Sequence, residues 1–69
     1  MRYAVVIEQA GEGFSAYVPD LPGCVAAGKS SEEVERLIRG AIEIHLSGLR
    51  EDGELIPDPV SRVEYIEIN

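Results

Sequence analysis

The stretch YVPDLPGCVAAGKSSEE, residues 17–33, contains most of the signals that decide the fold of this chain. Pro19 has no backbone N–H for a strand ladder, so the strand before it ends there or lies at a sheet edge. Pro22–Gly23 is typical of a tight turn. The small apolar residues 24–28 then predict a short third strand.

A long helix is predicted to follow directly. Ser30 and Glu33 have the spacing of a capping box, in which each side chain bonds the backbone N–H at the other residue. Apolar residues recur at helical spacing as far as Leu49, and Gly53 is a natural residue to end the helix. We therefore expect a helix over residues 31–52.

Strands are predicted on both sides of this segment. Residues 2–8 and 14–18 are rich in β-branched and aromatic side chains, and the glycines within residues 9–13 predict a hairpin turn. Mixed alternation over residues 60–68 predicts a fourth strand. We expect an α+β fold of order β-β-β-α-β, with three or four largely antiparallel strands and the helix on one face. Residues 1–69 would form a single domain.

The composition limits how so small a domain is stabilised and what it binds. Cys24 is the single cysteine and His45 the single histidine, which excludes an internal disulfide and a cysteine-rich zinc site. The formal net charge of −7 disfavours nucleic-acid binding, because phosphates would be repelled. It favours a basic protein partner, or serves solubility alone.

The apolar surface is larger than one chain of this design can bury. One helix covers one face of a sheet, yet the first predicted strand is apolar on both faces, and the apolar arc of the helix is wide. We therefore expect a homo-oligomer, a dimer or a tetramer, that buries the excess. The residues predicted for this interface are Val5, Ile44, Leu46, Ile66 and Ile68.

No residues are predicted to be catalytic, to ligate a metal or to bind a cofactor. Glu8 and Asp20 lie near strand ends, where a metal-dependent nuclease would place carboxylates, but two-metal chemistry needs several converging carboxylates. Asp20, between two prolines, is equally explained as a turn residue. His45 and Cys24 are interpreted as packing residues. We therefore expect that the chain is not an enzyme.

No membrane span or export signal is expected either. No apolar run reaches the ~20 residues that a membrane span needs, and the first residues lack the apolar core of a signal peptide. A cytoplasmic location without membrane contact is therefore the expectation.

Taken in order, these segments resemble the HicB family of small antitoxins. The resemblance is carried by residues 3–7, 16–24, 28–33, 41–46 and 48–59. It implies a partial RNase H-like fold that forms dimers or larger homo-oligomers. It also implies binding to HicA, a small basic toxin with a double-stranded-RNA-binding fold that cleaves mRNA. Many HicB proteins carry a C-terminal DNA-binding domain, which we do not expect after residue 69, so direct DNA binding is not expected.

The leading functional hypothesis is a protein-binding module that neutralises such a toxin by covering its active surface, without a cofactor. The residues predicted to contact the toxin are Glu8, Glu12, Tyr17, Asp20 and Tyr65. A solvated surface is the alternative for the acidic residues, and cross-strand packing for the tyrosines. Two other functions stay open: an orphan homo-oligomeric scaffold, and a metal-dependent nuclease.

Overall fold

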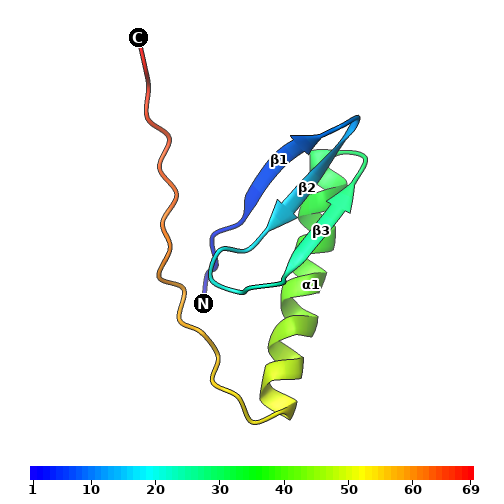
Figure 1. Ribbon diagram of the computed structural model, residues 1–69, viewed down its shortest axis with the longest axis vertical. Coiled ribbons are helices and arrows are strands. Elements are labelled where there is room, and N and C mark those ends of the chain that lie inside the picture. The colour runs from blue at the N-terminus through cyan, green and yellow to red at the C-terminus, as the bar shows by residue number, and fades with distance from the viewer.

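The computed structural model describes residues 1–69 and shows one antiparallel sheet with one helix packed on it (Figure 1). In chain order the elements are β1 (Val6–Ala10), β2 (Gly13–Tyr17), β3 (Val25–Gly28) and α1 (Ser31–Glu51). The strands lie side by side in the order β1-β2-β3, and α1 contacts all three. The predicted α+β fold is confirmed, as a three-stranded sheet followed by one helix.

β2 is the central strand, and its pairing fixes which side chains face the helix. Ile7 pairs with Ala16, and Ala16 pairs with Ala26, so these three residues share one face. At one end of the sheet, a Cβ on Gly13 would lie 2.5 Å from the carbonyl oxygen of Gly28. A residue without a side chain is therefore required where β2 meets the end of β3.

The start of α1 follows the sequence prediction closely. The Ser30 hydroxyl accepts a hydrogen bond from the backbone N–H of Glu33 at 3.0 Å. The Glu33 carboxylate accepts from the backbone N–H of Lys29 at 2.7 Å, one residue earlier than the capping box predicted. Both bonds satisfy donors that the helix leaves unpaired at its N-terminus.

The end of α1 is a Schellman motif. The N–H of Glu54 bonds the carbonyl of Leu49 at 2.9 Å, and the N–H of Gly53 bonds that of Arg50 at 3.1 Å. Gly53 has a φ of +71°, a conformation that glycine adopts without a steric penalty. The helix ends at Glu51, one residue before the predicted end, and Gly53 follows the C-cap Asp52 as the sequence predicted.

The core lies between the sheet and α1 and includes the loop between β2 and β3. It comprises Ala16, Val18, Leu21, Cys24, Val34, Ile38 and Leu46. Leu21, from the loop, is fully buried. Leu46, a residue predicted for an interface between chains, instead lies in this core. It follows Ile38 at two steps of i+4, which places it on the helix face that meets the sheet.

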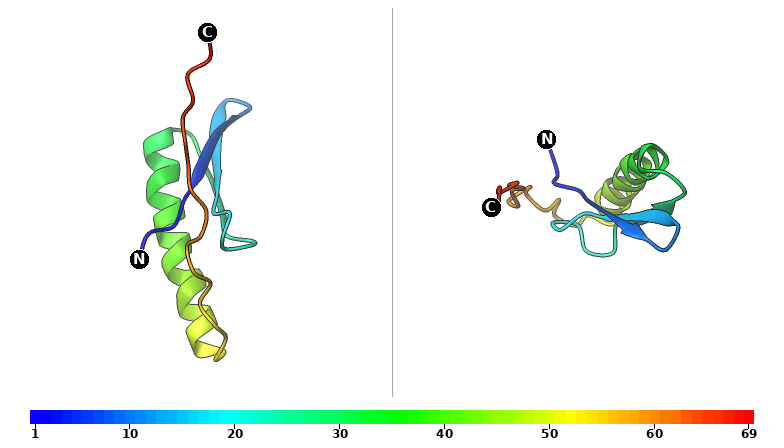
Figure 2. Two further views of the ribbon diagram at one scale, coloured as in Figure 1. Left: turned by 90° about the vertical axis from the view of Figure 1, so that its left-hand side faces the viewer. Right: turned by 90° about the horizontal axis from the view of Figure 1, so that it is seen from above.

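The C-terminal segment departs from the prediction of a fourth strand. Residues 60–68 contribute no strand to the sheet, and the turn and loop backbone hydrogen bonds end at Glu54. The segment passes on the β1 side of the sheet and runs apart from it towards the C-terminus (Figures 1 and 2). A strand needs a neighbour to pair with, and the sequence pattern alone does not say which neighbour that is. β1 keeps a free edge as a result.

Candidate binding surfaces

The sheet face opposite α1 is not covered by any element. Val6, Tyr17 and Val25 are aligned across the three strands on this face. Tyr17 is 44% exposed and Val25 63% exposed. Glu8 lies two residues after Val6 and therefore points to the same side. We call these four residues the open face, which brings together Glu8 and Tyr17, two of the residues predicted to contact a partner.

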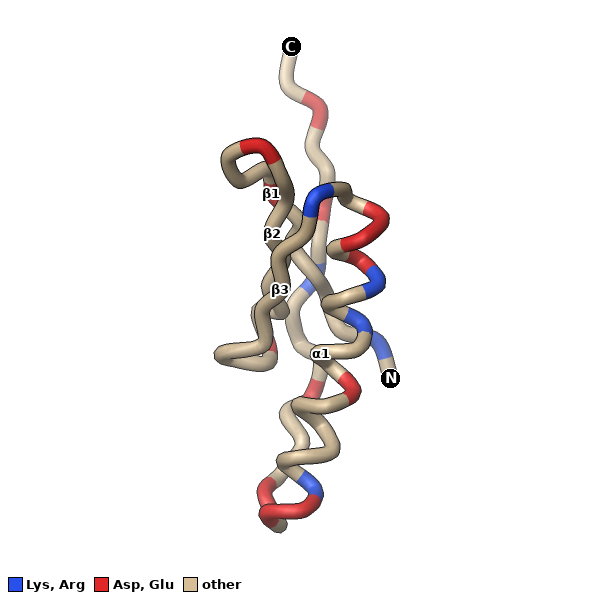
Figure 3. The backbone as a smooth tube through the Cα atoms, turned by 90° about the vertical axis from the view of Figure 1, so that its right-hand side faces the viewer, with Lys and Arg blue, Asp and Glu red and all other residues tan.

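The tip of the β1–β2 hairpin adds acidic charge beside the open face. Glu12 lies in the two-residue turn at this tip and is exposed. Acidic charge marks the hairpin tip, and α1 carries both acidic and basic residues along its length (Figure 3). The hairpin therefore presents negative charge at its tip and an aromatic side chain on its open face.

Asp20, the fourth predicted contact residue, is engaged within the chain. Its two carboxylate oxygens accept from the backbone N–H of Ser61 at 2.9 Å and from the Ser61 hydroxyl at 2.8 Å. The bond from the backbone N–H of Ser61 has the larger effect and the bond from its hydroxyl adds to it. Together they hold the pKa of Asp20 below its ordinary value. Asp20 is thus an ionised anchor for the C-terminal segment.

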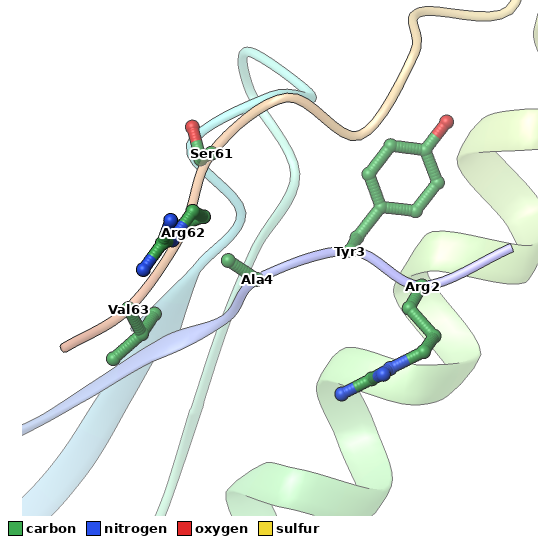
Figure 4. A pocket seen from close by; sticks show the side chains of 6 residues that line it. All are labelled: Arg2, Tyr3, Ala4, Ser61, Arg62 and Val63. Atoms are coloured by element: carbon green, nitrogen blue, oxygen red, sulfur yellow. The ribbon is translucent and has the colours of Figure 1, made fainter.

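A second attachment holds the same segment nearer to the helix. The Tyr3 hydroxyl donates a hydrogen bond to the carbonyl oxygen of Pro57. Tyr3 and Ser61 both border a cavity of about 420 Å³ that separates residues 2–4 from residues 61–63 (Figure 4). The C-terminal segment is therefore fixed at Pro57 and Ser61, and a cavity lies between its continuation and residues 2–4.

Beyond Ser61 the segment carries several large apolar side chains that are exposed. Tyr65 is 96% exposed, Ile66 77% and Ile68 84%. The segment also holds an exposed ion pair between Arg62 and Glu64. Three residues predicted for partner or interface contacts thus lie together here, and none is buried by this chain.

The remaining predicted interface residues lie on other surfaces. Val5 packs against the edge of the core, and Ile44 is 76% exposed on α1. Sequence reasoning missed Val25, which is exposed on the open face. Its alternation with the small residues of β3 was the available signal, but it does not tell which face the helix covers.

A groove of about 420 Å³ lies between the edge of β1 and α1. Val5, Ile7 and Ile42 contribute apolar side chains to it, and its charged residues are Arg2, Arg39 and Glu35. We call this the β1 groove. It opens beside the unpaired edge of β1, because β2 occupies the other edge.

No group of three or more histidine, cysteine or acidic residues is arranged to hold a metal ion. Cys24 is buried in the core, and desolvation raises the pKa of its thiol. Of the two carboxylates considered for a nuclease, Asp20 is bonded to Ser61. The structure also contains no helix with the length and apolar character that a bilayer span requires.

Comparison with known proteins identifies the class to which this small α+β chain belongs. Residues 3–69 match a family described as HicB-like antitoxin of bacterial toxin–antitoxin systems. The chain is 51% identical to a UPF0150 protein of Helicobacter pylori over 52 residues, which cover 75% of this chain and 72% of that protein. It is 39% identical to a UPF0150 protein of Archaeoglobus fulgidus over 67 residues, covering 93% and 97% of the two chains.

A phage protein is also similar but longer. It is an uncharacterized 14.9 kDa protein from the rep-hol intergenic region of Haemophilus phage HP1, 36% identical over 66 residues. The match covers 96% of this chain but 50% of the phage protein, so the chain spans about half of that relative's length. The chain belongs to the HicB-like antitoxin family, which confirms the resemblance found in the sequence.

Proposed function

We propose that this protein is the antitoxin of a toxin–antitoxin pair, and that it neutralises a small basic HicA-type toxin that cleaves mRNA. The observation that carries the proposal is the family match over residues 3–69. The protein would act by occlusion, covering the RNA-binding or catalytic surface of the toxin. Such a mechanism needs a fitted surface and complementary charge, and no cofactor.

The open face and the hairpin tip are the surface that best suits this role. Tyr17 offers an exposed aromatic anchor, a residue type that often dominates binding energy at interfaces. Glu8 lies on the same face and Glu12 at the adjoining tip. With a net charge of −7, the protein would attract a basic partner over a distance before contact. We assign Glu8, Glu12 and Tyr17 to direct contact with the toxin.

Asp20 and Tyr65 have different parts in this proposal. Because Ser61 occupies both carboxylate oxygens of Asp20, this residue would position the segment that carries Tyr65. Tyr65 is almost fully exposed and is assigned to partner contact. The complex would form in the cytoplasm, where mRNA is translated.

Self-association is a further part of the proposal. The exposed Ile44, Ile66 and Ile68 support it, because a monomer would leave these side chains in water. The same residues favour the second candidate function, a homo-oligomeric scaffold without a toxin. The two functions differ in whether a basic nuclease is bound.

The test is inhibition of a HicA-type toxin encoded beside this protein, measured as cleavage of an RNA substrate with purified components. We expect the protein to form a stable complex with the toxin and to stop cleavage. Tyr17→Ala and Glu12→Lys should each weaken the complex at least tenfold. Glu51→Lys, at the far end of α1, makes the same charge change away from the open face and should bind nearly normally. A protein that neither binds nor inhibits the toxin would leave the scaffold function in its place.

A further inference from the structure

The free edge of β1 and the C-terminal segment are two unpaired parts of one fold. β1 has a partner on the β2 side only, so its outer edge presents unpaired backbone N–H and C=O groups. Residues 62–68 are extended, are exposed and take no part in the sheet. The edge of β1 therefore lacks a neighbouring strand, and residues 62–68 could serve as that strand.

The segment does not reach the edge of β1 in its own chain. The bonds from Asp20 to Ser61 and from Tyr3 to Pro57 fix where it starts. From there a cavity separates it from residues 2–4, and it runs away from the sheet (Figures 2 and 4). A strand that is held away from its own sheet edge is free to pair with that of another copy.

We propose that residues 62–68 of one copy form the fourth strand of the sheet on the β1 edge of a second copy, and that this exchange completes the binding surface. The proposal rests on the self-association put forward under the proposed function. It adds the segment that exchanges, the edge that receives it and the residue that the second copy supplies.

The β1 groove matches one side of the proposed strand. In an extended segment Glu64, Ile66 and Ile68 point to the same side. The two isoleucines would fill the apolar part of the groove. Glu64 would meet Arg2 and Arg39, the two basic residues that leave the groove positively charged despite Glu35. Apolar fit and charge therefore agree on the occupant.

The other side of the strand would extend the open face. Tyr65 points away from Ile66, so it would lie on the face that carries Tyr17 and Glu8. A tyrosine hydroxyl needs a hydrogen-bond partner or water, and the solvent-exposed open face provides it. The surface proposed to bind the toxin would thus contain Tyr17 from one copy and Tyr65 from the other.

Disulfide trapping between differently tagged copies tests the exchange. One copy carries Ile7→Cys and the other Ile66→Cys; Cys24 stays in place because it is buried. We expect the mixed pair to form a cross-linked heterodimer as the main product on mild oxidation. A copy with Leu55→Cys, at a position that is 93% exposed, should cross-link to Ile7→Cys at least tenfold less. A double variant that closes within its own chain, as a monomer, would overturn the proposal.

Sedimentation of the full chain provides the second test. We expect Ile66→Asp with Ile68→Asp to convert the oligomer to monomer, and Leu55→Asp to leave it unchanged. An oligomer that survives the double substitution would disprove the exchange and leave self-association standing. Cross-linking without toxin binding would support the exchange and contradict the antitoxin function.

Discussion

Asp20 links two parts of the chain that lie 41 residues apart in the sequence. Its carboxylate accepts both hydrogen bonds from Ser61. A protonated carboxyl group would accept them more weakly, so the two bonds favour the ionised form. The pKa of Asp20 is therefore lower in the folded protein than in the unfolded chain. A residue that sequence analysis explains as a turn former thus has a second role, which is to hold the C-terminal segment.

This anchor should be lost in acid. A group with a lowered folded pKa stabilises the fold above its unfolded pKa, and the contribution disappears as pH falls through the folded pKa. We expect the Ser61 amide resonance to move on acidification with a midpoint below the ordinary carboxyl pKa. Asp20→Asn should abolish that transition and speed amide exchange at Ser61. Asp58→Asn, at an exposed aspartate, should leave both unchanged.

Leu21 supports Asp20 from the core side. It is fully buried, whereas Leu55 is 93% exposed. We expect Leu21→Ala to lower the free energy of unfolding by about 2–5 kcal/mol, the range for buried leucines, and Leu55→Ala to change it by less than about 0.5 kcal/mol. Urea denaturation followed by circular dichroism measures both. Equal effects would contradict the assignment of the loop to the core.

At the scale of elements, a glycine within α1 and the glycine that follows its C-cap differ in backbone conformation. Gly48 has helical backbone and no atom within 4 Å of an added Cβ, whereas Gly53 has a φ of +71°. Gly48→Ala should therefore stabilise the protein by about 0.5–1 kcal/mol. Gly53→Ala should destabilise it by about 1–2 kcal/mol, because alanine is strained in the left-handed region. Thermal unfolding should show opposite shifts for the two variants.

The elements that were predicted correctly are those whose signals lie close together in the sequence. The capping residues, the hairpin glycines and Gly53 act on neighbours within a few residues, so the helix and the first three strands could be inferred. Leu46 was misplaced because periodicity gives the angle between residues, but not which face meets the sheet. The attachment of Ser61 to Asp20 depends on tertiary structure, and no local pattern reports it.

The predicted fourth strand also shows that local sequence patterns do not report tertiary contacts. Alternation in residues 60–68 correctly indicates an extended segment, but pairing depends on a neighbour that the sequence does not name. Of the candidate contact residues, Glu8, Glu12 and Tyr17 were brought together by one hairpin. Tyr65 joins them only through the proposed second copy.

At the scale of the whole molecule, charge is the property that most directly links composition to the proposed function. The net charge of −7 is spread over the fold: the hairpin tip is acidic, and α1 carries both acidic and basic residues along its length (Figure 3). We expect this net charge to attract a basic toxin during diffusion, before any side chain makes contact, and the proposed contact surface makes the hairpin the docking end.

Electrostatic attraction of this kind is screened by salt, so binding of the toxin should depend on ionic strength. Raising the ionic strength from about 0.01 M to about 0.15 M shortens the screening length from roughly 30 Å to roughly 8 Å. The association rate with the toxin should fall at least tenfold over this range, while the dissociation rate changes much less. Stopped-flow or surface-based kinetics would measure both rates.

Charge substitutions make this test specific to the surface. Glu12→Gln should lower the association rate and reduce its salt dependence, because Glu12 lies at the acidic tip. Glu51→Gln removes the same charge at the C-terminal end of α1, away from the hairpin. It should have a smaller effect on the association rate and on its salt dependence. If the two variants were equal, attraction would follow net charge alone and the hairpin would not be the docking end. A larger effect at Glu12 would instead show that acidic residues at the hairpin end contribute most to the attraction of the toxin.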